Sequence, residues 1–586
     1  MIRQLRRLLG ALLFFLPVQV LAWRLDRRGR RKRAVLTLRL AGVLREERGG
    51  RRGDGRGWHA GILDVLQRAG HDASVQAVAL RIGSLQAGWG QLDEIRSTLL
   101  ELRARGRKVF VYLDRPGHAE FFLATAADHV AIAPLATLEI LGLRAEVTFF
   151  KGVLERAGVT PHFQSAGEFK SYSEVFTREG MSDEHREALD VVLRGIHEAF
   201  VAAVAQGRGL EPEAVQALID RGPFTADEAE EAGLLDEVLY PDQWKTAIRE
   251  ELGEHVPDDG EIKDPDARGR HVFAPAFRWL RMGRLLRRMN AFVTPRKKVV
   301  VLAAEGNIVE TDASEVGLGK IARRPLVAAL RELRKDEDVA AVVLRINSPG
   351  GSGLASDMIW RELRRLRRKK PLVASMGSVA ASGGYYLAMA ADEVLAAPLT
   401  ITGSIGVVAG KFDISALLGK LGVTRDVLSY GANTGLGSAT EGLTEAERDR
   451  LQVQIGAFYD AFVEKAADCR GVDPGTLERH ARGRIWTGTQ AAERNLIDST
   501  GTLGDAIRKA AVRAKLGTDY EVWYADPSRP GLLDRLQQLP IPGLAGARVE
   551  HAEGRLVELF DQILGAALGE RSDPIQVRLP FDLRIR

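Results

Sequence analysis

The chain carries Val75-Gln-Ala-Val-Ala-Leu-Arg-Ile82 and, 264 positions later, Val339-Ala-Ala-Val-Val-Leu-Arg-Ile346. Each stretch is a short apolar run rich in valine, leucine and isoleucine, which is typical of a buried strand. The likeness extends outward, because residues 75–158 align with residues 339–422 without a gap. The sequence therefore contains one domain twice, and its 586 residues are enough for each half to bury its own core.

Both halves alternate short apolar runs with longer amphipathic segments. In the first half, leucine and isoleucine recur at helical spacing over 91–105, which predicts an amphipathic helix there. The other expected elements are strands at 34–40, 75–82, 108–113, 130–133, 159–165, 299–303, 341–346 and 372–375, and helices at 119–127, 182–207, 357–368, 384–391 and 444–469. This order predicts an α/β fold in which right-handed crossovers build mostly parallel sheets.

The repeat also sets the expected domain boundaries. They are an N-terminal hydrophobic segment with a basic flank at 1–33, a first repeat at 34–255, a basic linker at 256–298, a second repeat at 299–515 and a C-terminal extension at 516–586. In the linker, Phe277–Phe292 fits either an amphipathic helix on a membrane surface or a connector that packs on a neighbouring subunit. In the extension, 555–568 is expected to be helical and 575–586 to form an edge strand.

Composition is that of an ordinary globular protein, with 45% hydrophobic and 27% charged residues. The net charge of +5 is small, but residues 24–33 and 278–298 are strongly basic. These basic runs lack interleaved base-stacking modules, which weighs against nucleic-acid binding. Cys469 is the only cysteine, so an intrachain disulfide is impossible and a cysteine-based metal site is not expected. No cofactor or metal is expected.

The N-terminus resembles a targeting segment. Three arginines at positions 3, 6 and 7 precede an apolar run from Leu8 to Trp23. The run is shorter than the roughly 20 apolar residues of a spanning helix, and a basic cluster follows it at 24–33. Three interpretations therefore stay open: a retained membrane anchor, a signal cleaved after Val20-Leu-Ala22, and a helix that lies on the membrane surface.

The second half carries a serine motif that the first half lacks. Ala380-Ala-Ser382-Gly-Gly384 aligns with Pro116-Gly-His118-Ala-Glu120. Ser382 is expected to follow a turn at 376–381 and to open a helix, where backbone N–H groups lack helical partners. The N–H of Gly383, together with one from a glycine turn at Pro349-Gly-Gly351, would form an oxyanion hole. The alternative role for Ser382 is that of a helix N-cap.

The first half shows the reverse asymmetry at a lysine. Gly167-Glu-Phe-Lys170-Ser-Tyr172 places Lys170 where the second half has Thr434. A serine nucleophile needs a base, and a buried lysine can serve because desolvation disfavours its charged form. Histidine, the commonest base, fits poorly, since His118 occupies the position equivalent to Ser382 and His480 lies far downstream. The residues thus predict a serine hydrolase whose Ser–Lys pair is shared between the two halves.

Three motifs of the second half resemble a known family. Asn347-Ser-Pro-Gly-Gly-Ser352, Met376-Gly-Ser-Val-Ala-Ala-Ser-Gly-Gly-Tyr385 and Leu399-Thr-Ile-Thr-Gly-Ser-Ile-Gly406 are similar to those of the long form of bacterial signal peptide peptidase A. The resemblance covers about residues 35 to 515 and includes the duplication. It implies tandem ClpP/crotonase-like domains and a membrane-bound serine protease. It also implies a homotetramer in the inner membrane, with periplasmic catalytic domains that degrade remnant signal peptides.

The same resemblance assigns roles to five residues. Ser382 would be the nucleophile and Lys170 the general base, with Ser404 orienting the lysine. Gly351 and Gly383 would supply the oxyanion donors. The residues alone also allow two other functions: an acyl-CoA hydratase or isomerase on the same fold, and a non-catalytic membrane scaffold.

Overall fold

The computed structural model describes residues 33–47, 57–254, 271–277, 279, 296–310, 319–518, 520–525 and 575–578. The predicted N-terminal segment, nearly all of the amphipathic stretch 277–292 and the expected helix at 555–568 lie outside the described residues. In the described part of the chain, no helix has the length and apolar character needed to cross a membrane.

The first repeat forms a parallel six-stranded sheet in the order β8-β4-β3-β2-β1-β9. Its strands are β1 (Arg33–Val43), β2 (Val75–Gln86), β3 (Lys108–Leu113), β4 (His129–Ile132), β8 (Glu237–Val238) and β9 (His271–Pro275). Its helices are α3 (His59–His71), α4 (Trp89–Ala104), α5 (His118–Ala124), α9 (Pro212–Arg221), α10 (Ala226–Glu231) and α11 (Trp244–Glu251). Strand β9 comes from the segment expected to be a linker, so that segment also completes this sheet.

The second repeat forms a mostly parallel sheet in the order β19-β17-β15-β13-β10-β21, with β16 and β20 joined through β15. Its strands are β10 (Lys298–Glu305), β13 (Val339–Ser348), β15 (Leu372–Ala381), β16 (Glu393–Ala396), β17 (Ile401–Gly403), β19 (Ile485–Thr487), β20 (Ser499–Thr500) and β21 (Glu521–Ala525). Its helices are α13 (Arg323–Lys335), α14 (Gly353–Arg367), α15 (Gly383–Ala388), α18 (Pro474–Glu478), α19 (Gly488–Glu493) and α20 (Leu503–Arg513). Both sheets confirm the predicted α/β class.

A third sheet joins the two repeats, in the order β12-β11-β14-β22-β18-β6. Its strands are β6 (Thr160–Ala166), β11 (Asn307–Val309), β12 (Lys320–Ala322), β14 (Gly350–Ser352), β18 (Val407–Asp413) and β22 (Ile575–Arg578). The antiparallel ladder between β6 and β18 runs from Ala166 opposite Val407 to Thr160 opposite Asp413. Because β6 belongs to the first repeat and β18 to the second, this ladder brings their functional segments together.

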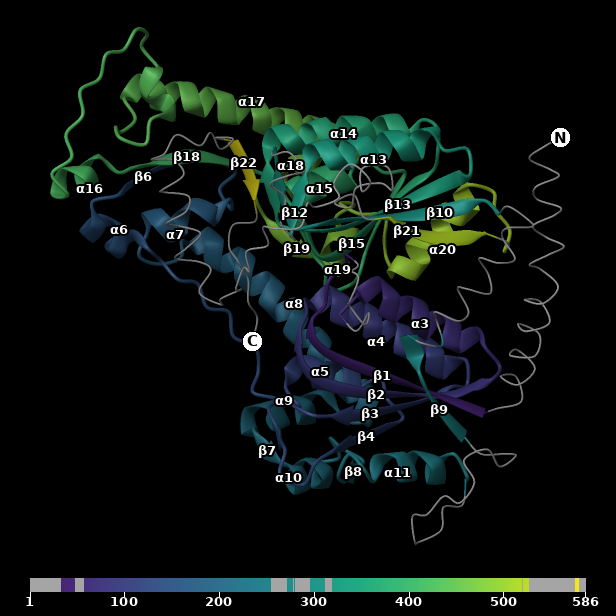
Figure 1. The fold of residues 1–586 in the computed structure, drawn as a ribbon. Coiled ribbons are helices and arrows are strands. Elements are labelled where there is room, and N and C mark those ends of the chain that lie inside the picture. Colours follow the sequence, from purple (N-terminus) through teal and green to yellow (C-terminus); the bar gives the residue numbers. More distant parts are fainter. Residues whose placement is uncertain are drawn as a thin grey trace, which may run out of the picture.

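Smaller elements and two long helices complete the fold (Figure 1). The smaller ones are β5 (Thr137–Leu138), β7 (Phe224–Thr225), α6 (Lys151–Ala157), α7 (Glu174–Thr177), α16 (Ser415–Lys420) and two 3₁₀ turns, Ser171–Ser173 and Thr434–Gly437. The long helices α8 (Asp183–Arg208) and α17 (Glu445–Arg470) start at N-cap side chains, Ser182 and Thr444. Helix α8 packs on β19 of the second repeat, while α17 packs on β6 of the first, so each long helix contacts a strand of the other repeat.

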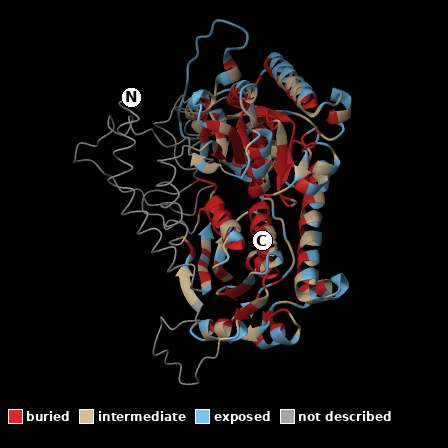
Figure 2. Cartoon of the chain, turned by 90° about the vertical axis from the view of Figure 1, so that its right-hand side faces the viewer, coloured by how far each residue is buried: buried red, intermediate tan, exposed pale blue. Residues whose placement is uncertain are grey.

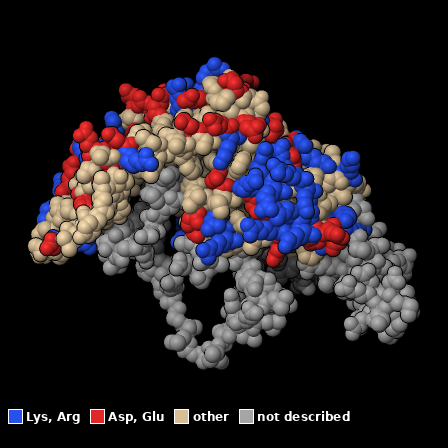
Figure 3. All heavy atoms as spheres, turned by 90° about the horizontal axis from the view of Figure 1, so that it is seen from above, with Lys and Arg blue, Asp and Glu red and all other residues tan. Residues whose placement is uncertain are grey.

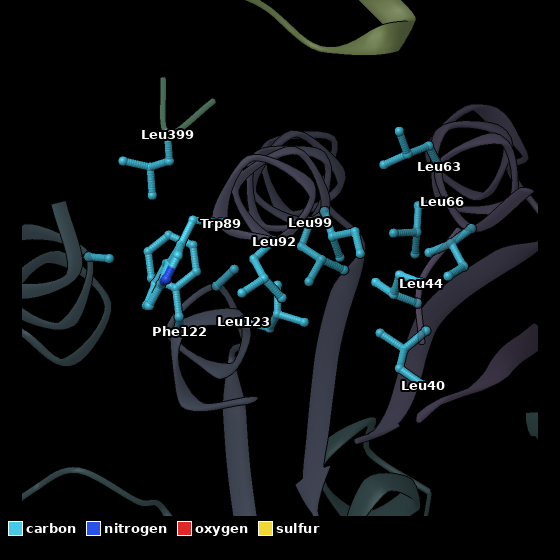
Figure 4. Close-up of a cluster of buried hydrophobic side chains, with 14 of the residues drawn as sticks. Leu40, Leu44, Leu63, Leu66, Trp89, Leu92, Leu99, Phe122, Leu123 and Leu399 are labelled. Carbon is cyan, nitrogen blue, oxygen red and sulfur yellow. The ribbon is translucent and has the colours of Figure 1, made fainter. Parts of the chain in front are cut away.

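One hydrophobic core runs through both repeats. It contains side chains from strands β1, β2, β3 and β4 of the first repeat and from β10, β13 and α20 of the second. Leu399 of the second repeat points toward Trp89 of α4 (Figure 4). Figure 2 shows buried residues in both sheets and in the helices between them. The two repeats therefore pack as one body.

Charged side chains are also buried between the repeats. Arg345 of β13 donates hydrogen bonds to Glu94 of α4 and to Glu46. The distance from Arg345 Nη2 to Glu46 Oε1 is 2.9 Å. His59 lies beside both carboxylates, and all four side chains are at most 1% exposed. Each buried charge has lost its hydration shell, so removing the oppositely charged partner of any one of them would destabilise the fold.

Three local expectations were wrong. Residues 376–381 form the end of strand β15 and not a turn, and the glycines expected in a turn form strand β14. A Cβ on Gly377 would lie 3.1 Å from the Cβ of Asn347, so the glycine marks a close approach of neighbouring chains. The strand at 575–578 is not at an edge, because β14 and β18 flank it on both sides.

Candidate active site

Ser382 stands at the junction of β15 and α15, as the sequence predicts. Its backbone has φ 56° and ψ −114°, a sparsely populated conformation that costs on the order of 1–3 kcal/mol. A bond from its N–H to the Gly403 carbonyl, at 2.8 Å, holds it there. The side chain makes no N-cap hydrogen bond, so the alternative capping role is not realised. The strained junction turns the Ser382 hydroxyl toward another partner.

Lys170 follows β6, at the end of the ladder that crosses between repeats. Gly167, with φ 100°, turns the chain there, and the Lys170 N–H donates to its carbonyl at 3.0 Å. The Phe169 N–H donates to the carbonyl of Arg482 at 2.9 Å. The short segment that carries Lys170 is thus fixed on the second repeat.

These placements bring the predicted pair together. Lys170 Nζ lies 2.7 Å from Ser382 Oγ, 2.9 Å from Ser404 Oγ and 3.0 Å from the Ser404 carbonyl oxygen. Lys170 is 2% exposed and both serines are fully buried. Burial lowers the pKa of Lys170 well below its ordinary value, because the ammonium form loses its hydration.

Nζ has three oxygen neighbours, which match the three N–H donors of an ammonium. A neutral lysine has two N–H donors and one lone pair. When Lys170 is neutral, the two bonds to Ser404 can use both donors, and the lone pair can then accept the proton of the Ser382 hydroxyl. Ser404 is itself held in a positive-φ conformation (53°) by a bond from its N–H to the Arg484 carbonyl, at 2.6 Å. The arrangement prepares the Ser382 oxygen to lose its proton.

The two predicted oxyanion glycines lie on neighbouring elements. A Cβ on Gly383 would stand 3.2 Å from the Cα of Gly350, so the start of α15 and strand β14 are in close contact. The N–H of Gly350 is taken by Ser348 Oγ at 3.2 Å. Gly351 has φ 152°, and a Cβ there would lie 2.1 Å from the Ile308 carbonyl oxygen. Only glycine fits at that position.

The equivalent positions of the first repeat hold no such site. His118 accepts a bond from the Gly142 N–H at 3.0 Å, and its ring packs on Phe200. Burial lowers the pKa of His118 to about 4. Ile140, the counterpart of Ser404, is a buried core residue. His118 therefore has a structural role away from the Ser–Lys pair.

A supporting segment, Arg482-Gly483-Arg484, was not predicted from the sequence. The Gly483 N–H donates to the Ile405 carbonyl at 2.7 Å, and the Arg484 guanidinium lies 3.5 Å from the centre of the Phe169 ring. One segment therefore holds both Lys170 and Ser404. The sequence does mark this segment, because Gly483-Arg-Ile-Trp occupies the same place at the end of the second repeat as Gly222-Pro-Phe-Thr at the end of the first. Among the described residues, no cluster of His, Cys, Asp or Glu could hold a metal ion.

Comparisons with known proteins identify the family of this chain. The profile of peptidase family S49 matches twice, at residues 101–254 and 364–517. A chloroplastic serine protease SPPA from Arabidopsis thaliana is 32% identical over 85% of this chain and 72% of its own length. Protease 4 of Haemophilus influenzae is 30% identical over 77% of this chain and 72% of its own, and that of Salmonella typhi is 27% identical over 85% and 81%.

One solved structure, a ClpP1 variant from Listeria monocytogenes, matches 36% of this chain and 94% of its own at 12% identity, with a TM-score of 0.23. The sequence relatives set aside the acyl-CoA enzyme and the non-catalytic scaffold. With its domain present twice, the chain belongs to peptidase family S49 and is a serine protease.

Proposed function

We propose that the protein cleaves peptides through an acyl-enzyme, with Ser382 as nucleophile and Lys170 as general base. The observation that carries this is the 2.7 Å contact between Lys170 Nζ and Ser382 Oγ in a fully buried setting. Lys170 takes the hydroxyl proton as Ser382 Oγ attacks the peptide carbonyl, and then gives that proton to the leaving amine. Water, activated by the same lysine, hydrolyses the ester.

Two backbone N–H groups stabilise the tetrahedral intermediates in this mechanism. Gly383, directly after the nucleophile, is the first donor, and Gly351 on β14 is the second. Removing one such donor typically costs about 100–1,000-fold in rate. Ser404 acts by orientation, since its two contacts with Nζ leave only the lone pair for Ser382.

The substrates we propose are apolar peptides, including remnant signal peptides. Leu354 lies two residues after β14 and is 56% exposed. Val379 of β15 is half-buried and lies three residues before the nucleophile. An apolar surface at this edge favours small or hydrophobic substrate side chains.

We also place the protein at the inner membrane as a homotetramer, with the catalytic domains in the periplasm. The arginine-flanked apolar run at 8–23 supports attachment. Lysine and arginine gather on the face of α13 and α14 (Figure 3), a charge that suits anionic lipid headgroups. Val427, Leu428 and Tyr430 are strongly exposed, which suits contact with another subunit. Light scattering of the detergent-solubilised chain would give the subunit number.

A peptide panel tests the substrate class. Quenched fluorogenic peptides with signal-peptide-like apolar cores would be compared with charged peptides of the same length. The proposal predicts cleavage of the apolar set, with fragment masses showing small or apolar residues before the cut. Equal cleavage of charged peptides would contradict the substrate class, and no cleavage by purified, folded protein would contradict the function.

A further inference from the structure

Strand β15 has a bulge just before the nucleophile. Ile346 of β13 lies opposite Met376 of β15. The next paired residue, Ser348, lies opposite Ala380, so β15 takes four steps along the chain while β13 takes two. A bulge interrupts the ladder of backbone hydrogen bonds and changes the direction of the strand. Because Ser382 follows only two residues after Ala380, the shape of this bulge determines where the Ser382 hydroxyl lies.

A side chain of β13 holds the bulge from within the second repeat. Asn347 lies between the two paired positions, and its Oδ1 accepts a hydrogen bond from the Val379 N–H at 3.1 Å. The side chain thus takes the place of a ladder carbonyl, and without it a backbone donor of the bulge would lose its partner. On the opposite side, Thr400 Oγ1 donates to the Gly377 carbonyl at 2.6 Å.

The first repeat holds the same bulge through helix α4, which packs on β15 (Figure 1). Ser378 Oγ accepts a hydrogen bond from the Gln91 N–H at 3.1 Å, so a residue of the catalytic strand caps the other repeat's helix. A Cβ on Gly88 would lie 2.3 Å from the Ser378 Cβ, and one on Gly90 would lie 2.8 Å from the Gly377 carbonyl oxygen. The start of α4 therefore lies directly against the bulge.

The first repeat has no counterpart of this arrangement. At the positions equivalent to Asn347 and Ser378 it has Gly83 and Asp114. Asp114 accepts hydrogen bonds from Arg81 instead, and the ladder between β2 and β3 runs to its end without a register shift. The bulge and the two side chains that hold it therefore occur only in the repeat that carries the nucleophile.

We propose that Asn347 and Ser378 are positioning residues that fix the bulge of β15, so that Ser382 Oγ meets Lys170 Nζ. This inference rests on the function proposed above. Asn347 anchors the bulge to β13, and Ser378 anchors it to the repeat that supplies the lysine. The contact between Ser382 and Lys170 measures 2.7 Å, and a displacement of about 1 Å can cost roughly 100-fold in rate.

Two single substitutions test the proposal, each in the full chain. Asn347→Ala removes the acceptor of the Val379 N–H, and Ser378→Ala removes the cap of α4. Each variant is expected to lower kcat for a fluorogenic apolar peptide about 10–100-fold with little change in KM. The matched control is Thr225→Ala, which removes the cap of α10 in the first repeat and should keep the wild-type kcat.

The pH profile separates positioning from a general loosening of the fold. Lys170 stays buried if only the bulge shifts, so the rise of kcat/KM with pH should keep its midpoint while its plateau falls. A loosened core would admit water to Lys170 and raise its pKa, which would move the midpoint to higher pH. Thermal unfolding of each variant checks that the chain remains folded, and either variant alone is sufficient for the test.

Hydrogen exchange measured by mass spectrometry reports on the bulge without catalysis. Amides in fragments that cover residues 376–382 should exchange about tenfold faster in Asn347→Ala than in the wild type, because one hydrogen bond of the bulge is lost. In Ser378→Ala, fragments that cover residues 88–92 should also exchange faster. Strand β10 should exchange as in the wild type in both variants.

The outcomes separate this inference from the proposed function. If the folded variants keep the wild-type kcat, or if the midpoint of the pH profile moves to higher pH, the positioning role is refuted while the peptidase function stands. If exchange rises in the bulge as expected but the wild-type chain cleaves no peptide, the two side chains do hold the bulge and the proposed function fails.

Discussion

Gly483 offers a test of how precisely Lys170 must be held. It has φ 84°, and a Cβ on it would lie 2.5 Å from the Lys170 nitrogen and 2.8 Å from the Lys170 Cα. An ordinary contact begins at 3.4 Å, so Gly483→Ala must displace the lysine backbone by up to 0.9 Å. Catalytic groups tolerate errors of about 0.5 Å, and a displacement of about 1 Å can cost roughly 100-fold in rate.

We therefore expect Gly483→Ala to lower kcat about 100-fold with little change in KM, measured with a fluorogenic apolar peptide. Gly209→Ala is the matched control. Gly209 also has a positive φ (67°), but it ends α8 and no atom lies within 4 Å of its Cβ position. That variant should lose about 1–2 kcal/mol of stability and keep its activity. If Gly483→Ala is folded and retains the wild-type kcat, the positioning argument is refuted.

Three further predictions concern pH, the buried charges and Ser404. Because burial lowers the pKa of Lys170, kcat/KM should rise with pH until the lysine is neutral and then level off; a profile flat from pH 5 to 9 would contradict this. Arg345→Met should cost about 3–5 kcal/mol in urea unfolding by leaving two carboxylates without their partner, whereas Arg81→Met, at the equivalent but exposed position, should cost under about 1 kcal/mol. Ser404→Ala should lower kcat about 10–100-fold at unchanged KM, through loss of the bond that orients Nζ; an unchanged kcat would remove that role.

The duplication made much of the fold predictable. Apolar runs that recur at one offset located the central strands of both sheets, which are β1 to β4 in the first and β10, β13 and β15 in the second, and β3 has the predicted bounds. Comparing the repeats also singled out Lys170 and Ser382, and the family resemblance added Ser404; the structure brings the three side chains into contact. A lone buried lysine has no periodic pattern, so only its replacement in the second repeat made it visible.

The remaining features depend on contacts between distant segments. Gly377 suggested a turn, but its small size serves a close approach of neighbouring chains within a strand. Strands β14 and β22 have few residues, and their pairing depends on open backbone edges that leave no mark in side-chain patterns. The support that Arg482–Arg484 give to Lys170 is likewise made by backbone groups, which every sequence possesses.

The central claim is that one Ser–Lys pair, shared between the repeats, performs the chemistry. The most direct test is kcat/KM for Ser382→Ala, Lys170→Ala and the double variant, with Thr434→Ala as the control at the position equivalent to Lys170. We expect kcat/KM of both single variants and of the double variant to fall by the same factor, at least about 1,000-fold, because parts of one unit fail together. Thr434→Ala should stay active. Substantial activity in Lys170→Ala would contradict the shared pair. A kcat/KM of the double variant far below that of either single variant would contradict it as well.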